Sequence, residues 1–117
     1  MKNKINAGDF VKVGGEYGMC NGLYGGRVAF VTSQVKNRES RFVRQGEEIE
    51  ICETQEEKEA ARNAALVYYT LELQGIKRRL KNWEVFKEID CKETLLANKK
   101  ICEYWINVLS EEKQDQQ

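Results

Sequence analysis

The longest uninterrupted pattern in the chain runs from Thr54 to Ile89, a stretch with no proline and a single interior glycine. Its apolar side chains recur at steps of three and four residues, the spacing of a helix face that packs on another helix. They are Leu66, Tyr69, Leu73, Ile76, Leu80 and Trp83. The pattern predicts one helix of about 36 residues, roughly 54 Å long, which exceeds the width of a compact domain of this size. Part of this helix is therefore expected to contact a second copy of the chain.

Two helix starts are predicted in this half of the chain. Thr54 and Glu57 have the spacing of a capping box, in which the hydroxyl and the carboxylate satisfy each other's free backbone amides. Asp90 and Glu93 repeat that spacing and predict a second helix that runs to about Ser110. Only one or two residues separate the helices, which predicts an antiparallel hairpin. The apolar positions of the second helix are Leu95, Leu96, Ile101, Cys102, Trp105, Val108 and Leu109.

The first half of the chain has the pattern of short strands separated by glycine. Asp9–Val13 alternates, with Val11 and Val13 on one side, and Gly14–Gly15 interrupts it. Further strands are predicted at Arg27–Thr32, Arg41–Arg44 and Glu48–Cys52, with a tight turn at Gln45–Glu47. The expected fold class is α+β: a small N-terminal antiparallel β-sheet followed by a C-terminal antiparallel two-helix hairpin that oligomerises through the helices. The expected single domain 1–117 comprises a sheet region 1–53, the hairpin 54–110 and a flexible tail 111–117.

The predicted helices differ in length, so the second covers only the later part of the first. The uncovered part, about Glu57 to Tyr69, is rich in alanine, which permits close approach of another element. Part of this surface is expected to close the sheet, and the remainder is expected to form a dimer contact.

Composition narrows the classes of function. The 117 residues are 41% hydrophobic and 32% charged with zero net charge, which fits one folded domain and argues against a strongly basic nucleic-acid binder. The chain has no histidine, which removes the usual general base and the histidine-containing metal sites. The protein is thus predicted not to be an enzyme and to need no cofactor or metal. Four cysteines without a C-x-x-C pair, and no secretory segment, predict free thiols in the cytoplasm, with Cys52 and Cys102 as buried apolar groups.

The most promising ligand-binding segment is Arg78–Trp83. Arg78 and Arg79 provide planar groups suited to phosphate, Asn82 provides an amide, and Trp83 provides a face on which a base can stack. Tyr69 lies two to three turns earlier on the predicted helix. The simpler interpretation is a solvated basic face with Trp83 in the core.

Two other segments carry weaker signals. Gly25, Gly26 and Arg27 could bring backbone amides and a positive charge to an anion, but their spacing matches no phosphate-binding motif, and a hairpin turn explains the glycines equally well. Arg41 and Arg44 are three residues apart and lie on opposite strand faces, so with Arg38 they form a phosphate clamp only if several chains contribute.

The chain as a whole resembles a known family. The resemblance rests on Gly8–Val13, on Gly22–Val31, and on Tyr68–Leu73 running on to Trp83, in a small neutral protein without histidine. These features resemble the phage Thoeris anti-defence sponges, which sequester the signalling nucleotide made by bacterial TIR-domain enzymes. The resemblance implies binding of a glycocyclic ADP-ribose without cleavage, in pockets shared by two protomers, in the cytoplasm of an infected bacterium. It also implies a homo-oligomer, a dimer or a hexamer, with cyclic oligonucleotides at a second site in some members.

The expected function is therefore capture of a cyclic ADP-ribose-type signal, which blocks TIR-based immunity. An alternative is a protein-binding regulator that acts through its sheet and its exposed helix. Neither a membrane nor a polymeric nucleic acid is expected as a partner. The residues predicted to bind the ligand, chosen from their chemistry, are Gly25, Gly26, Arg27, Tyr69, Arg78, Arg79, Asn82, Trp83 and Trp105.

Overall fold

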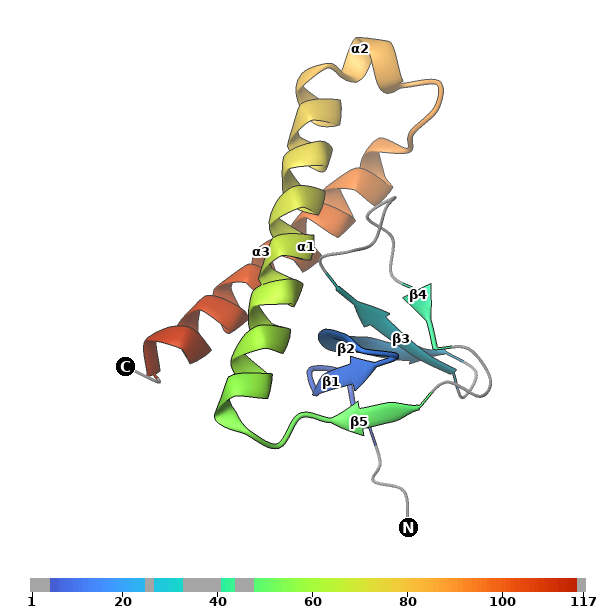
Figure 1. The fold of residues 1–117 in the computed structure, drawn as a ribbon. Helices are drawn as coiled ribbons and strands as arrows, with labels where there is room; N and C mark the ends of the chain where they lie inside the picture. The colour runs from blue at the N-terminus through green and yellow to red at the C-terminus, as the bar shows by residue number, and fades with distance from the viewer. Residues whose placement is uncertain (1–4, 25–26, 33–40, 44–47, 116–117) are drawn as a thin grey trace. The chain divides into compact units, whose positions relative to one another are not determined.

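The computed structural model describes residues 5–24, 27–32, 41–43 and 48–115 (Figure 1). The chain forms two compact units, Met1–Tyr68 and Tyr69–Gln117. The boundary between them falls inside the long helix α1, Gln55–Lys81, which contributes to both. The predicted α+β class is confirmed: an antiparallel sheet comes first in the chain, and helices follow it.

The first unit contains a five-stranded antiparallel sheet with the order β4-β3-β2-β1-β5. Four strands follow one another as a meander, and the fifth returns to pair with the first. Their bounds are Phe10–Val13 for β1, Glu16–Tyr24 for β2, Arg27–Val31 for β3, Arg41–Phe42 for β4 and Ile49–Ile51 for β5. The predicted strands at 9–13, 27–32, 41–44 and 48–52 each contain one of these. The predicted turn at Gln45–Glu47 lies outside the described residues.

The alternation predicted for β1 is confirmed. Val11 and Val13 are fully buried, whereas the residues between and before them are half-exposed. Gly14 and Gly15 adopt positive φ angles of 55° and 87°, and Val13 pairs with Glu16 across them. Two consecutive positive φ angles suit a two-residue hairpin loop, and glycine reaches them without steric cost.

The longest strand, β2, was not predicted. Its three glycine and asparagine positions, Gly18, Asn21 and Gly22, give low strand propensity, and a hairpin turn was the simpler explanation for the glycines of Gly22–Gly26. In the structure the strand continues to Tyr24, and only Gly25 and Gly26 of that segment fall outside the described residues. A Cβ atom at Gly18 would collide with the backbone carbonyl oxygen of Val31. The close approach of β3 therefore requires glycine at position 18, although glycine has a low strand propensity.

The sheet is buried on both faces around its centre. Val11, Val13 and Phe30 form a core cluster on one face, extended by Ile5, Val43 and Ile49. Residues that alternate with them along β2 and β3 are also buried, namely Met19, Ala29 and Val31. Since both faces exclude water, a change in a small central residue disturbs packing rather than solvation.

Helix α1 begins where the sequence predicts. The Thr54 hydroxyl oxygen accepts a hydrogen bond from the Glu57 backbone amide at 3.1 Å, and the Glu57 carboxylate accepts one from the Thr54 amide at 3.3 Å. The Thr54 hydroxyl also donates to that carboxylate at 3.0 Å. These hydrogen bonds hold the pKa of Glu57 below its usual value. The predicted capping box is confirmed.

The predicted end of this helix is wrong. Helix α1 stops at Lys81, and a separate short helix, α2, spans Trp83–Phe86. Asn82 leaves the helical conformation, and its side-chain amide donates to the Arg78 carbonyl at 3.1 Å. Asparagine competes for helix carbonyls in this way, which ends the regular ladder. The 27 residues of α1 span only about 40 Å, so helix length is no longer an argument for a second copy.

The third helix, α3, spans Lys92–Asp115. Its first hydrogen bond runs from the Leu95 amide to the Cys91 carbonyl, so Cys91 rather than the predicted Asp90 occupies the N-cap position. The helix also continues past the predicted end at Ser110 into the segment expected to be a tail. Ten residues, including α2, separate α1 from α3, where one or two were predicted.

Within the second unit, the later part of α1 runs antiparallel to α3, as predicted. Tyr69 stacks on Trp105, and Trp83, further along the chain, lies beside Lys92, which comes earlier in α3. As the residue number increases along the first helical segment, the residue number of its partner in α3 decreases, which defines an antiparallel hairpin. Buried apolar residues lie along it: Ile76, Leu95, Cys102 and Leu109. Among the described helices, none has an apolar run sufficient to cross a bilayer.

Candidate functional site

Four of the predicted ligand-binding residues lie together at the end of α1. Arg78 and Arg79 occupy its last turn with exposed side chains, and Asn82 follows the helix. Trp83 begins α2 and is half-buried. This placement leaves part of the indole accessible beside two exposed guanidinium groups. The solvated basic face of the simpler interpretation agrees with the exposure of both arginines, whereas Trp83 is only half-buried.

Lys92 belongs to the same cluster, although it was not among the residues predicted to bind the ligand. Its ammonium lies 5.9 Å from the centroid of the Trp83 ring, within the range of a cation–π interaction. The predicted helical hairpin could have indicated Lys92, because an antiparallel hairpin brings the start of the second helix beside the end of the first. We refer to Arg78, Arg79, Asn82, Trp83 and Lys92 as the hairpin-end cluster.

The charge around this cluster is positive, although the whole chain is neutral. From Lys77 to Glu93 the chain carries six lysines and arginines and four carboxylates. One of the lysines, Lys87, is paired with Glu84 at 2.9 Å. Arg78 and Arg79 also lie at the negative end of the α1 dipole, which accounts for part of their placement. The remaining positive charge favours an anionic group near Trp83.

The predicted aromatic residues do not form a single site. Tyr69 is 3% exposed, and its ring lies 6.3 Å from that of Trp105 in a stacked arrangement. Trp105 in turn contacts Tyr104 edge-on at 5.1 Å. Tyr69 lies about 20 Å along the chain from Trp83, because each helical residue advances 1.5 Å. One ligand base cannot stack on both, so Tyr69 and Trp105 are assigned to packing of the hairpin.

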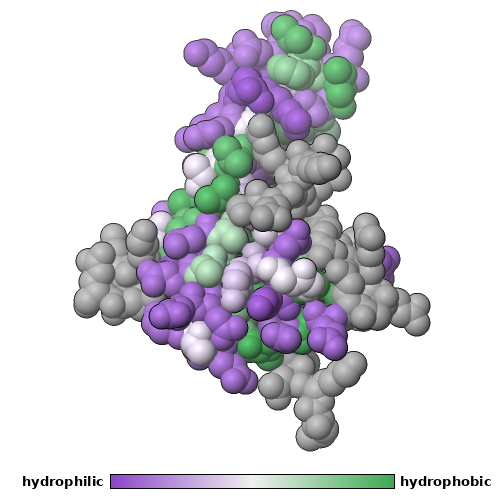
Figure 2. Space-filling model, in the orientation of Figure 1, coloured by the Kyte–Doolittle hydropathy of each residue, from purple (hydrophilic) through white to green (hydrophobic). Residues whose placement is uncertain are grey.

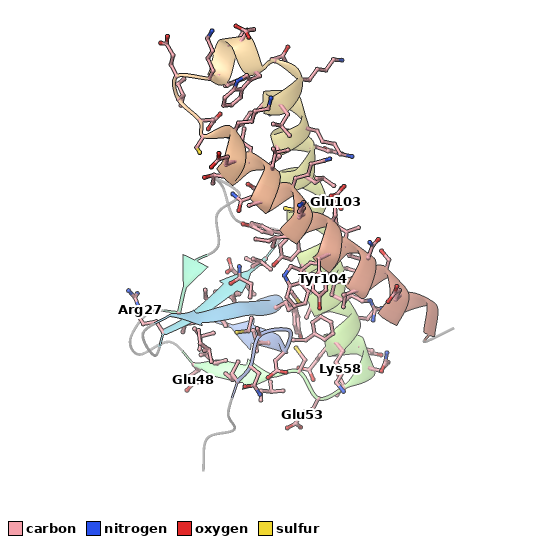
Figure 3. All side chains as sticks on the ribbon, turned by 180° about the vertical axis from the view of Figure 1, so that it is seen from behind. Arg27, Glu48, Glu53, Lys58, Glu103 and Tyr104 are labelled. Carbon is pink, nitrogen blue, oxygen red and sulfur yellow. The ribbon has the colours of Figure 1, made fainter. Side chains whose placement is uncertain are left out.

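The remaining predicted residues belong to the other unit. Arg27 begins β3 with an exposed side chain that points away from the sheet (Figure 3). Gly25 and Gly26, which precede it, lie outside the described residues. Arg27 and the hairpin-end cluster are therefore two separate candidates.

The cysteines fall into two groups. Cys20, Cys52 and Cys102 are buried, and desolvation raises the pKa of each thiol, that of Cys102 to about 11. Nearby Glu72 and Glu103 add to the raised pKa of Cys102. The interpretation of Cys52 and Cys102 as buried apolar groups is confirmed. Cys91 differs: it is exposed, and hydrogen bonding to the Thr94 side chain and to backbone amides lowers its pKa.

One polar residue of α1 is buried without having been predicted. The Arg62 side chain is fully buried and donates to the Glu59 carboxylate at 3.3 Å. Buried charged residues are uncommon unless they are paired. Ala61 and Ala65 on the same part of the helix are also fully buried. Their small side chains allow the rest of the unit to approach this helix face closely. Among the described residues, no group of three or more potential metal ligands occurs.

Comparisons with known proteins do not assign the chain to a family. No protein-family model, curated protein or solved structure matches it.

Proposed function

We propose that the protein captures an anionic nucleotide at the hairpin-end cluster and holds it without cleavage. The observation that carries this proposal is the accessible Trp83 ring with a lysine ammonium 5.9 Å away and two exposed arginines one turn earlier. The specific ligand proposed from the family resemblance is a cyclic ADP-ribose-type signal. Capture would block TIR-based immunity in the cytoplasm of an infected bacterium.

The chemistry of such a ligand suits the cluster. A cyclic ADP-ribose carries a pyrophosphate and an adenine. The adenine would stack on the Trp83 ring, and Lys92, displaced from that ring, would meet a phosphate oxygen. The guanidinium of Arg79 offers a two-pronged partner for the same group. A rigid cyclic ligand loses little conformational entropy on binding, which favours tight capture.

Sequestration requires binding and no bond cleavage. The protein would compete with the host receptor by mass action, so abundance and affinity determine its effect. Its residues support this role, because the hairpin-end cluster offers cations, an amide and an aromatic ring rather than a paired acid and base.

The test is recovery of the ligand. The protein is incubated with cyclic ADP-ribose isomers, separated from free ligand and heated, and the released molecule is identified by mass spectrometry. Intact ligand supports sequestration. A cleaved product indicates an enzyme, and absence of any retained ligand contradicts the proposal.

Variants locate the site. Arg79→Ala and Trp83→Ala are expected to abolish retention while leaving the far-UV circular dichroism spectrum unchanged. Lys58→Ala, which removes an exposed lysine near the start of α1, is the matched control and should retain ligand. Loss of retention in Arg27→Ala would show that the sheet unit contributes to ligand binding, and unchanged retention would show that it does not. If Trp83→Ala fails to fold, Arg79→Ala still tests the site.

A second candidate is a protein-binding regulator. It is favoured by exposed apolar side chains in and after α2: Val85 is 73% exposed and Ile89 is 81% exposed. Figure 2 shows apolar surface at the α2 end of the molecule, surrounded by polar residues. This function predicts a stable complex with a protein in the absence of nucleotide. Val85→Glu should abolish that complex and leave nucleotide retention intact.

A further inference from the structure

Helix α3 carries two apolar rows, and only one of them is buried. Leu95, Cys102 and Leu109 are seven residues apart and at most 5% exposed. A second row follows the steps four, three and four along the same helix: Ala97, Ile101, Tyr104 and Val108. In this outer row, Ile101 is 51% exposed and Tyr104 is 59% exposed. The helix therefore presents a second seam of the type that packs on another helix.

The geometry points to a second copy of α3, antiparallel to the first, as the occupant of the outer row. With the two-fold axis midway between Ile101 and Tyr104, Ile101 faces Tyr104 of the second copy. Ala97 then faces Val108 of the second copy. Each layer pairs a smaller side chain with a larger one, and the same surface serves both chains, as a two-fold interface requires.

Charge selects the antiparallel orientation. The first half of α3, residues 92–102, contains three lysines and one glutamate, whereas residues 103–111 contain two glutamates and no lysine. An antiparallel copy places each basic half beside an acidic half, and the two helix dipoles also oppose each other. A parallel copy would place like charges together. The charge pattern along α3 is thus complementary to itself.

The central aromatic residue of this row is already oriented. Tyr104 packs edge-on against Trp105 at 5.1 Å, and Trp105 stacks on Tyr69 (Figure 3 labels Tyr104 on α3). A side chain held in this way loses less rotamer entropy when a partner covers it. Trp105 also lies next to the proposed contact, so its fluorescence should respond to association.

The contact is expected to be weak. The outer row from Ala97 to Val108 is about 17 Å long, so two such helices bury less than the roughly 1,200 Å² typical of stable interfaces. A reversible dimer in the micromolar range is the expected result. This inference does not depend on nucleotide capture, and it transfers the expected oligomer contact from α1 to α3.

Sedimentation velocity over a wide range of protein concentration tests the inference. The wild-type chain should pass from monomer to dimer, and Ile101→Glu should remain monomeric with an unchanged circular dichroism spectrum. Leu96→Glu is the matched control, because Leu96 is 43% exposed on α3 but lies outside the outer row. The control should still dimerise. A monomer at all concentrations, or a dimer that Leu96→Glu disrupts as strongly as Ile101→Glu, would overturn the inference.

Disulfide trapping tests the orientation. In a Cys91→Ser background, Ala97→Cys and Val108→Cys proteins should each resist cross-linking alone and form a cross-linked dimer when mixed. The reason is that each position faces the other in an antiparallel pair, whereas two copies of position 97 are about 16 Å apart along the axis, too far for a disulfide. Cross-linking of Ala97→Cys to itself would indicate a parallel pair and overturn the assignment.

Discussion

Individual side chains of the same type have different chemistry here because their surroundings differ. Cys102 lies in the hairpin, where burial raises its pKa to about 11, whereas Cys91 lies at the exposed start of α3 with a lowered pKa. The thiolate is the nucleophile, so reactivity follows both exposure and pKa. The four cysteines are therefore expected to react with alkylating reagents at very different rates.

Cys91 should be the first thiol modified. Because the pKa of Cys91 is below the ordinary value, a larger fraction of this thiol is ionised near neutral pH. Its labelling rate should therefore begin to fall at a lower pH than the rate of an ordinary cysteine. Iodoacetamide labelling of the native protein, followed by peptide mass spectrometry, measures this order. Thr94→Val, which removes the side-chain hydrogen bond that lowers this pKa most, should raise the pKa of Cys91 and slow labelling. Faster labelling of Cys20, Cys52 or Cys102 in the folded protein would contradict the assignment.

Gly18 should tolerate no side chain. In Gly18→Ala the new methyl group would collide with the Val31 carbonyl and touch the Phe30 ring at 3.0 Å, so β2 and β3 must separate. Overpacking of this kind costs about 1–3 kcal/mol of unfolding free energy. Urea denaturation measures the loss. Gly15→Ala is the comparison: nothing lies within 4 Å of its new methyl, and only its positive φ of 87° opposes it. Equal unfolding free energies for Gly18→Ala and wild type would show that β2 and β3 accommodate the methyl group without loss of packing.

At the level of secondary structure, the start of α1 and the alternation of β1 were predicted correctly, whereas β2, the end of α1 and the N-cap of α3 were not. The Thr54 capping box and the alternation of β1 depend on residues within a few positions of each other, so the sequence alone indicates them. The strand β2 depends on its neighbours β1 and β3, whose pairing outweighs its glycine content. The end of α1 at Asn82 depends on one side-chain hydrogen bond that competes with the apolar periodicity.

The candidate site shows the same division. Sequence chemistry identified Arg78, Arg79, Asn82 and Trp83, which are neighbours along the chain. Lys92 was missed because its contact with Trp83 depends on the course of the chain between α1 and α3. Tyr69 was grouped with Trp83 because both lie on one apolar seam, but their separation along the helix places them in different contacts.

The α1 cap predicts a specific dependence on pH. The folded-state pKa of Glu57 is lowered by its bonds to Thr54, so its contribution to stability is present above the pKa of the unfolded chain and is lost as the pH falls through the folded-state pKa. Thr54→Ala removes this hydrogen-bonding partner and should cost about 1 kcal/mol at neutral pH. Urea denaturation at neutral and acid pH measures both effects. The difference between variant and wild type should shrink in acid, and a constant difference would exclude the Glu57 contribution.

On the scale of the whole molecule, one continuous helix belongs to two compact units. The sheet core and the hairpin each have buried apolar residues of their own, including Val11 and Phe30 in the first and Ile76 and Leu109 in the second. The backbone hydrogen bonds of α1 pass without interruption from one unit to the other. Stability of either unit is therefore expected to depend on the helix at their boundary.

Thr70 is a suitable position at which to test this dependence. It is exposed on α1 immediately after the boundary, so Thr70→Pro interrupts the helix without removing a buried side chain. Proline in a helix interior costs about 3 kcal/mol. Hydrogen exchange followed by mass spectrometry should show faster exchange in both the sheet and α3. Thr70→Ala is the control and should leave exchange unchanged, and faster exchange confined to one side would indicate that the units are energetically independent.

The pairing of β5 with β1 has a consequence for synthesis of the protein. The β1–β2 hairpin can form as soon as Met19 has left the ribosome, because its contacts are local. The outer edge of β1 stays open until Ile49–Ile51 arrives, and then Val11 pairs with Ile51. During that interval the nascent chain exposes an unpaired strand edge, which is a site of misassociation between chains. Helix α1 follows β5 after three residues, so completion of the sheet and nucleation of the first helix are expected to occur almost together on the ribosome.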